Sequence, residues 1–271
     1  MPFLVASDDT RLHYEVEGSG PPLVLHIGAG GDSELWRVAG YVDQLARSYK
    51  CILFDHRGHG KSDHPATVAA NHLDRYADDV AALVARLGLP RVSYFGWSAG
   101  VYVGVRAAEL HPELFDALVL MGGIGSRLSP EEIEANSRRR MPELEGTGWW
   151  SILEPMRASE KFPVPQWFFD RIVATDLEPY KAWIKGRPNW NWSPWDALPK
   201  IKTPTLLIAG ELEDPHDDDS KAVAVMPDAS RVRVPDRQHI NAFLCSEFVA
   251  PLVLDFLASR RARSGAGGKA P

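Results

Sequence analysis

The stretch Arg91–Gly100 reads RVSYFGWSAG, and it decides the fold. Val92–Phe95 predicts a buried strand and Val101–His111 predicts a helix, so the chain must turn sharply at Ser98. Glycines two positions before and two positions after the serine fit such a turn, because a Cβ at either place would clash with the crowded backbone. The turn holds the serine hydroxyl clear of the sheet, and we therefore predict that Ser98 is a catalytic nucleophile.

Length and composition are typical of a globular protein with a large core. The 271 residues are 45% hydrophobic and 24% charged, and the net charge of −6 argues against nucleic acid as a partner. No apolar run reaches the roughly 18 residues of a membrane span, and the first residues lack a signal-peptide pattern. Cys51 and Cys245 have no metal or redox spacing, so we expect buried thiols. These features predict a cytoplasmic protein with a small-molecule substrate and no membrane partner, and they favour no oligomeric state.

Strand and helix patterns alternate along the chain. The expected strands are Phe3–Ala6, Leu12–Glu17, Leu23–Ile27, Cys51–Phe54, Val92–Phe95, Ala117–Met121, Thr205–Ala209 and Arg231–Val234. The expected helices include Leu35–Ser48, Tyr76–Leu87, Val101–Leu110, Pro130–Met141, Gln166–Thr175 and Phe248–Leu257. Alternation of this kind predicts parallel strands joined by right-handed crossovers, with the active site at their carboxyl ends. Ser98, the loop Gly28–Gly31 and the turn Asp55–Gly60 all fall at that edge.

Together these motifs resemble the α/β-hydrolase family. The turn Asp55–Ser62, DHRGHGKS, is similar to the family's D-x-R-G-x-G-x-S, and Leu23–Gly31 followed by Trp36 is similar to its oxyanion-loop strand. The resemblance implies an α/β fold: a mostly parallel eight-stranded sheet with helices on both faces and an inserted helical cap.

The resemblance also divides the chain into regions. Residues 1–124 and 198–260 would form the core, 125–197 the helical cap, and the small, polar residues 261–271 a disordered tail. The segment from 125 to 197 holds seven of the nine tryptophans. They pack this subdomain against the core, or some of them line a substrate pocket. Our candidates for substrate binding are Trp97, Trp149, Trp150, Trp190 and Trp192.

A serine nucleophile needs a base to accept its proton and an acid to orient that base. The family order of serine, acid and histidine assigns His239, the only histidine after the last expected strand, as the base. Asp214 follows the preceding strand and is the expected acid. The rivals are Glu211 and Glu213, which sit closer to the strand, and Asp217–Asp219, which resemble a solvated helix start.

The oxyanion hole is the third part of the expected site. Ala99 directly follows the nucleophile and would donate one backbone N–H. The family carries His-Gly after the oxyanion-loop strand, whereas here Ile27 occupies the histidine position and Gly28 follows it. Matching Gly28 to the family glycine makes Ala29 the second donor, with Gly28 itself as the alternative.

The expected activity is hydrolysis of a carboxylic ester or lactone of a small, bulky or aromatic substrate through an acyl-enzyme. Carbon–carbon bond hydrolases and cofactor-free perhydrolases share this triad, and a small-molecule receptor that does not turn over belongs to another class. Serine at the nucleophile position argues against the branches that use aspartate. We expect no cofactor, because the glycine loop is not G-x-G-x-x-G. We also expect no metal, although His216 lies beside the aspartates.

Overall fold

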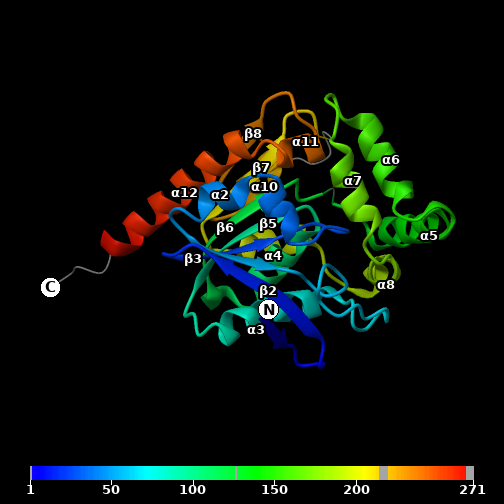
Figure 1. Cartoon of the computed structure of the whole chain (residues 1–271), viewed down its shortest axis with the longest axis horizontal. Helices are drawn as coiled ribbons and strands as arrows, with labels where there is room; N and C mark the ends of the chain where they lie inside the picture. Colours follow the sequence, from blue (N-terminus) through cyan, green and yellow to red (C-terminus); the bar gives the residue numbers. More distant parts are fainter. Residues whose placement is uncertain (1, 126, 214–218, 267–271) are drawn as a thin grey trace.

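The computed structural model describes residues 2–125, 127–213 and 219–266, and within these ranges it contains one eight-stranded sheet (Figure 1). The strand order is β1-β2-β4-β3-β5-β6-β7-β8. β2 is antiparallel to both neighbours, and all pairs from β4 across to β8 are parallel. The bounds are β1 (Phe3–Val5), β2 (Arg11–Glu17), β3 (Pro22–His26), β4 (Lys50–Phe54), β5 (Val92–Trp97), β6 (Phe115–Met121), β7 (Thr205–Gly210) and β8 (Ala229–Val234). The expected mostly parallel sheet is confirmed.

The parallel strands inside the edge strand β8 are buried on both faces, which explains why their sequences are mostly apolar. In β3, Leu23 and Leu25 join one hydrophobic core, and Val24 joins the other. The helices over the first core are α1 (Glu34–Val38), α2 (Tyr41–Leu45), α11 (His239–Phe243) and α12 (Ser246–Ala266). The helices over the second are α3 (Leu73–Arg86), α4 (Ala99–Leu110) and α10 (Asp219–Val225). Helices therefore cover both faces, as expected.

The segment Leu35–Ser48 folds as two short helices, α1 and α2, rather than as the one helix that the sequence predicts. Gly40 lies between them with a φ of 83°, a left-handed conformation that ends a helix. The break lets both Trp36 and Tyr41 enter the core, where the Tyr41 hydroxyl donates to the carbonyl oxygen of Phe243 at 2.9 Å.

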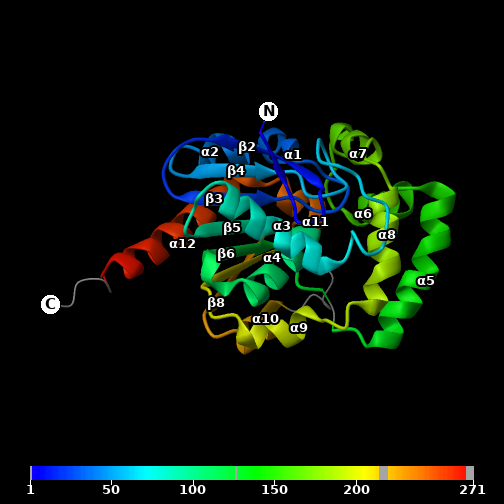
Figure 2. The ribbon, with the colours of Figure 1, turned by 90° about the horizontal axis from the view of Figure 1, so that it is seen from below.

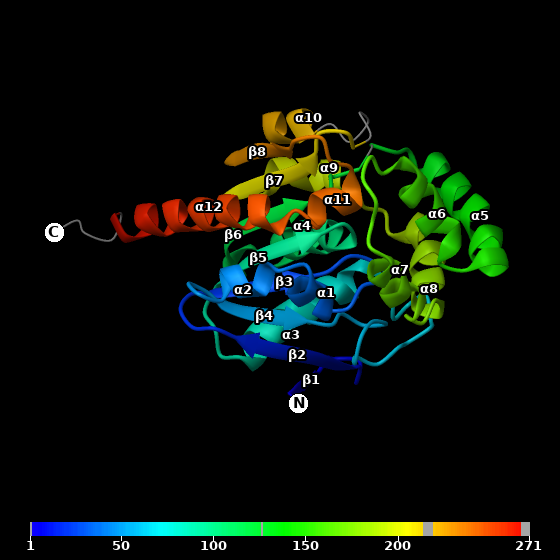
Figure 3. The same cartoon turned by 45° about the horizontal axis from the view of Figure 1, so that its top comes forward.

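The chain between β6 and β7 forms a group of helices apart from the sheet. Their bounds are α5 (Pro130–Thr147), α6 (Trp150–Ser159), α7 (Gln166–Val173) and α8 (Glu178–Gly186), followed by α9 (Pro194–Ala197) and by 3-10 turns at Arg187–Asn189 and Leu198–Lys200. We call α5–α8 the inserted helices. Figures 2 and 3 show them gathered at one end of the sheet, opposite the end toward which α12 extends. Because the Thr175 hydroxyl donates to Gly30 O at 2.7 Å, just after β3, they lie at the carboxyl edge of the strands.

The start of α5 follows from local sequence. The Ser129 hydroxyl accepts a hydrogen bond from the Glu132 N–H, and the Glu132 carboxylate accepts one from the Ser129 N–H. This capping box, with Pro130 at the first helical position, satisfies N–H groups that a helix start leaves open.

The structure corrects two expectations near the end of the chain. Helix α12 runs to Ala266, past Arg260, so the expected disordered tail 261–271 does not begin at residue 261. Alanine and arginine favour helix there, and Arg260 makes an ion pair with Asp228 at 2.9 Å. Residues 267–271 lie outside the described residues.

Asp219 is not part of a solvated helix start. It opens α10, but it is buried, and its carboxylate accepts hydrogen bonds from Arg233 at 2.6 Å and from Arg231 at 3.2 Å. Because a buried carboxylate is stabilised by charged donors, this aspartate joins α10 to β8. Residues 216–218 lie outside the described residues.

Two simpler expectations concern the cysteines and the membrane. Cys51 and Cys245 are both free thiols, and burial raises the pKa of the Cys51 thiol to about 12, so it is unreactive at neutral pH. Among the described residues, none of the helices combines the length and the apolar character that crossing a bilayer requires.

Candidate active site

Ser98 lies at the turn from β5 into α4, as the sequence predicts. Its φ of 56° and ψ of −116° are strained for a residue with a side chain. Its N–H donates to Met121 O at 2.8 Å, which holds the turn against β6. A Cβ on Gly100 would come within 2.5 Å of His26 O, and one on Gly96 would collide with the Gly100 carbonyl. Both glycines are therefore required for the backbone to make this turn.

His239 reaches the nucleophile from the other side of the sheet edge. It follows β8, opens α11, and places its Nε2 at 3.0 Å from Ser98 Oγ. Gly122, just after β6, makes room for this approach, because a Cβ there would lie 2.7 Å from His239 Cε1. The imidazole is 23% exposed, so a substrate or a water molecule can reach it. The two side chains have the geometry of a nucleophile and its base.

Glu213 is the described carboxylate that contacts the second imidazole nitrogen. Its Oε2 lies 3.3 Å from His239 Nδ1, and its Oε1 accepts a hydrogen bond from Gly210 N–H at 2.6 Å. Although burial alone would raise it, the pKa of Glu213 is held below its ordinary value, mainly by the hydrogen bond and charge of His239. The carboxylate is therefore ionised at neutral pH and can orient the imidazole.

The expected acid, Asp214, lies outside the described residues. Of its rivals, Glu211 is exposed, and its carboxylate accepts a hydrogen bond from the Asp236 N–H at 3.0 Å. Glu213 contacts His239 although it lies closer to the strand than Asp214 does in the sequence. Leu212 N–H donates to Arg237 O at 2.9 Å, so the chain leaving β7 stays beside the segment that carries His239.

The oxyanion donors expected from the sequence lie beside the nucleophile. Ala29 and Ala99 both line the pocket that contains Ser98. The backbone hydrogen bonds among the described residues include none donated by either N–H, so both can serve a substrate oxygen. The alternative donor, Gly28, packs against the serine, since a Cβ there would come 2.8 Å from Ser98 Cβ.

The DHRGHGKS turn supports the oxyanion loop rather than the reacting groups. His59 Nε2 accepts a hydrogen bond from Gly30 N–H at 2.8 Å, and Asp55 Oδ1 accepts one from Ser33 N–H at 2.7 Å. Both bonds join the loop after β4 to the loop after β3. The turn motif therefore fixes the position of the segment that carries Ala29.

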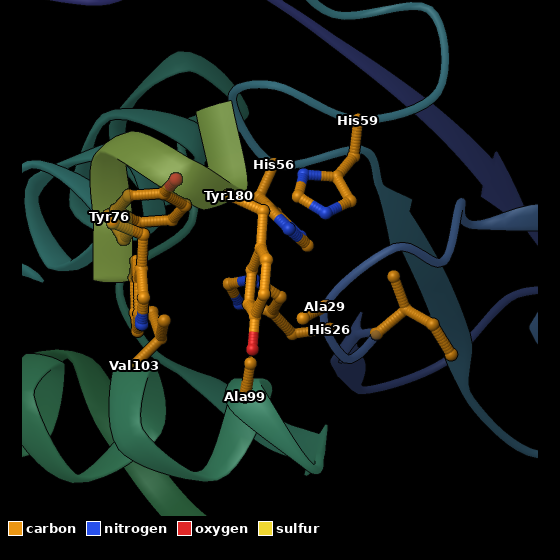
Figure 4. A pocket seen from close by; sticks show the side chains of 10 residues that line it. His26, Ala29, His56, His59, Tyr76, Ala99, Val103 and Tyr180 are labelled. Carbon is orange, nitrogen blue, oxygen red and sulfur yellow. The ribbon is translucent and has the colours of Figure 1, made fainter. Parts of the chain in front are cut away.

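A small enclosed cavity lies beside this loop, with room for about one water molecule, about 10 Å³ (Figure 4). Its lining includes Ala29, Ala99 and the rings of His26, His56 and His59. Among the described residues, Nδ1 of His26 and Nδ1 of His56 have no hydrogen-bond partner. Burial lowers the pKa of His26 to about 3 and that of His59 to about 4, so both rings are neutral in the folded protein.

The pocket that contains Ser98 has a volume of about 210 Å³. One wall belongs to the sheet edge and to α4, and it consists of Ala29, Ser98, Ala99, Tyr102, Gly122, Gly123 and Gly125. The other wall comes from the inserted helix α8 and the turn after it, and it consists of Tyr180, Trp183, Ile184, Arg187 and Trp190. We call this hollow the Ser98 pocket.

Two of the five tryptophans expected to bind substrate lie at open space near the nucleophile. Trp190 lines the Ser98 pocket, and Trp192 lines a smaller hollow beside it. Trp97 is buried instead, with its ring stacked on His239 at 5.1 Å and on Phe243 at 4.3 Å between centroids. It supports the base from within the core.

Trp149 and Trp150 pack among the inserted helices. Trp149 is buried, and its Nε1 donates to Thr175 O at 2.7 Å. Trp150 lies against Phe169, with ring centroids 5.8 Å apart. Neither is among the residues that line the Ser98 pocket.

Tyr180, Trp183 and Arg187 are pocket residues that sequence reasoning missed. Their spacing of three and four residues puts them on one helix face, and this period was the signal available in the sequence. In Figure 4 the Tyr180 hydroxyl points toward Ala99, so this ring separates the small cavity from the Ser98 pocket.

The end of α6 contacts the helix that carries His239. The Glu160 carboxylate accepts hydrogen bonds from Ile240 N–H at 2.6 Å and from Asn241 Nδ2 at 2.7 Å. Lys161 N–H donates to Gln238 Oε1 at 2.6 Å. The inserted helices are thus bonded to the residues on both sides of the base.

Comparisons with known proteins identify the family. The profile of the alpha/beta hydrolase fold matches residues 21–147. A protein of Rhizobium rhizogenes, named as a candidate carbamate hydrolase, is 34% identical over 214 residues, which cover 73% of this chain and 78% of that protein. The chain therefore belongs to the α/β-hydrolase family, and the resemblance seen in the sequence is confirmed.

The individual relatives differ in how much of the chain they match. A non-heme haloperoxidase of Rhodococcus erythropolis is 43% identical over 101 residues, which cover 37% of this chain and 35% of that enzyme. An esterase of Exiguobacterium antarcticum superposes with a TM-score of 0.82 at 20% identity, over 94% of this chain and 98% of its own. The enol-lactonase of Burkholderia xenovorans LB400 superposes with a TM-score of 0.78 at 23% sequence identity, over 95% of this chain and 100% of that enzyme. These two structures establish the fold alone.

Proposed function

We propose that this protein is a serine hydrolase that cleaves a carboxylic ester or lactone through an acyl-enzyme. The observation that carries the proposal is the contact of 3.0 Å between Ser98 Oγ and His239 Nε2 at a strained turn. A hydroxyl is a weak nucleophile until a base takes its proton, and this arrangement supplies that base. The Glu213 carboxylate on Nδ1 supplies the acid.

The steps follow from these positions. His239 Nε2 takes the proton of Ser98 as Oγ attacks the substrate carbonyl, and Glu213 stabilises the imidazolium that forms. The N–H groups of Ala29 and Ala99 bind the oxyanion. His239 then gives the proton to the departing alcohol. Water that His239 deprotonates attacks the acyl-enzyme, releases the acid and restores Ser98.

The inserted helices support a role in substrate choice. We propose that residues 125–197 act as a cap on a core made of residues 1–124 and 198–260, because α8 and the turn after it form one wall of the Ser98 pocket. The pocket is small, and Trp183 and Trp190 give it apolar aromatic surface. A short ester or lactone with a bulky or aromatic group fits this lining.

Perhydrolysis is a second candidate. It uses the same acyl-enzyme, with hydrogen peroxide in place of water, so the same three side chains serve both reactions. The observation in its favour is the relative named as a non-heme haloperoxidase. Detection of peracid when an ester and peroxide are supplied together separates it from hydrolysis alone.

The experiment combines turnover with labelling. Purified protein is assayed on p-nitrophenyl esters and lactones, and the acyl-enzyme is sought by intact mass and mapped by peptide digestion. We expect steady turnover and an adduct on Ser98. Ser98→Ala should lower kcat by at least about 10³-fold with unchanged circular dichroism. Ser93→Ala, at a buried serine on β5, the strand that leads to Ser98, is the matched control. Retention of more than about a tenth of the activity by Ser98→Ala would remove the nucleophile assignment.

A further inference from the structure

Arg187 is the charged side chain that lines the Ser98 pocket. It follows directly after α8 and shares the pocket with the nucleophile and with Ala29 and Ala99. The smaller hollow beside the pocket is lined by Arg187, Tyr102 and Trp190, but not by Ser98 or Ala99. Arg187 therefore lies on the side of the pocket away from the oxyanion donors.

Within the described part of the chain, Arg187 has no ion pair and no side-chain hydrogen bond to a carboxylate. Its guanidinium lies over the Tyr102 ring, 5.5 Å from the centroid, and this contact holds it in place without neutralising it. No aspartate or glutamate is among the described residues that line the pocket. Arg187 is thus a half-buried cation between aromatic walls, and the described residues supply no counter-ion for it.

Glu109 is bonded to Trp192, which lines the smaller hollow beside Arg187, and this carboxylate is already engaged. Glu109 pairs with Arg106 at 2.8 Å and with Lys200 at 2.9 Å, and it also accepts a hydrogen bond from Trp192 Nε1 at 2.7 Å. The charge of Arg187 also acts on the pocket residue Tyr180. Burial raises the pKa of Tyr180, and the positive charges of Arg140 and Arg187 partly offset that rise.

We propose that the substrate carries a carboxylate besides its scissile ester or lactone bond, and that Arg187 binds this carboxylate. The proposal rests on the serine hydrolase function above and names its substrate class. Guanidinium is always charged and matches a carboxylate with two parallel hydrogen bonds, so one arginine both neutralises and orients such a group. With the carboxylate held at one side of the pocket, the carbonyl is placed at Ser98. The free energy of binding the carboxylate, away from the reacting bond, then helps to hold the carbonyl in position for attack by Ser98.

The test compares half-esters with diesters of the same short dicarboxylic acid. Monomethyl and dimethyl glutarate have nearly the same size and differ by one carboxylate, so the ratio of their kcat/KM values reports the charge. We expect the half-ester to be preferred by about 10- to 10³-fold. Arg187→Met should bring this ratio to about 1, and Arg187→Lys should restore part of it. Lys185→Met, an exposed lysine on α8, is the matched control and should keep the wild-type ratio.

A binding measurement separates this proposal from the function on which it rests. Calorimetry with the Ser98→Ala protein and monomethyl glutarate should give an affinity that falls at least about tenfold when Arg187→Met is added. If no ester is turned over but this difference is seen, the hydrolase function fails and the anion site stands. If esters are turned over and the diester is preferred, or the ratio is the same in Arg187→Met, the carboxylate proposal is overturned.

Discussion

The carboxylate of Glu160, at the end of helix α6, accepts a hydrogen bond at 2.6 Å from the backbone N–H of Ile240, the residue after His239. The first N–H groups of a helix have no partner inside it, and a negative charge there is favourable. Glu160 satisfies this need for α11, so an inserted helix fixes the start of the helix that carries the base.

Removal of that carboxylate should weaken catalysis through the position of His239. We expect Glu160→Ala to lower kcat by about tenfold with a smaller change in KM. A hydrogen bond to a charged group is worth about 1.5–3 kcal/mol, and the part of this free energy that keeps His239 in place for proton transfer affects kcat. Steady-state kinetics checks this. Glu154→Ala removes an exposed carboxylate of the same helix, paired with Arg157 at 2.7 Å, and should change little. Equal losses in the two variants would contradict a positioning role.

The identity of the acid can be tested by two neighbouring substitutions. Glu213→Gln should lower kcat by roughly 10²–10⁴-fold, since the amide no longer fixes the tautomer of His239. Asp214→Asn should cost less than about tenfold by the same reasoning. Both are measured by steady-state kinetics on one ester, with circular dichroism to verify folding. The opposite ranking would return the role to Asp214, the residue expected from the sequence.

The tryptophans should separate into pocket and packing residues. Trp190→Ala enlarges the Ser98 pocket, so we expect it to change the ratio of kcat/KM between bulky and short esters by about tenfold. Each methylene that loses its contact costs about 0.8 kcal/mol. Trp150→Ala, within the inserted helices, should leave the ratio as it is. The measurement is a series of acyl chain lengths, and an unchanged ranking in Trp190→Ala would place specificity elsewhere.

The buried histidines predict an acid-sensitive fold. The pKa of His59 is lowered to about 4, whereas an unfolded histidine titrates near its model value of 6.5. As pH falls below 6.5, the unfolded state gains a proton that the folded state cannot take, so stability is lost until about pH 4. Between pH 7 and pH 5, wild type should lose about 2 kcal/mol relative to His59→Gln. Urea unfolding of both proteins at pH 7 and pH 5 checks this. If the difference in unfolding free energy between wild type and His59→Gln is the same at both pH values, His59 does not titrate in this way.

Much of the fold could be predicted because the parallel strands are buried on both faces. Runs such as Leu23–Ile27 and Thr205–Ala209 have few polar residues, and the glycines around Ser98 specify a turn that other residues cannot make. The break at Gly40 was missed, since a glycine within a helical pattern is tolerated in some helices and ends others. Only the core packing of Tyr41 decides between these outcomes.

The site was harder to predict wherever it depends on distances across the chain. Glu213 and Asp214 are adjacent and both carry a carboxylate, so their order in the sequence does not determine which of them contacts His239. Among the described residues, Glu213 makes this contact. The tryptophans were selected by residue type, and residue type does not separate Trp190, which lines the Ser98 pocket, from Trp149 and Trp150, which contact other inserted segments. Arg187 had no distinctive neighbours in the sequence, because its surroundings come from α4 and from the loops after β3 and β6.

The Ser98 pocket has one wall from a single short segment, Tyr180–Trp190, while the reacting groups belong to the sheet edge and the loops after its strands. A change in that segment alters the shape and charge that a substrate meets, and it leaves the nucleophile, the base and the oxyanion loop in place. Under the proposed function, substrate preference and reaction chemistry are therefore separate evolutionary variables in this chain. For protein engineering, this segment is the place to randomise when a new ester is to be accepted.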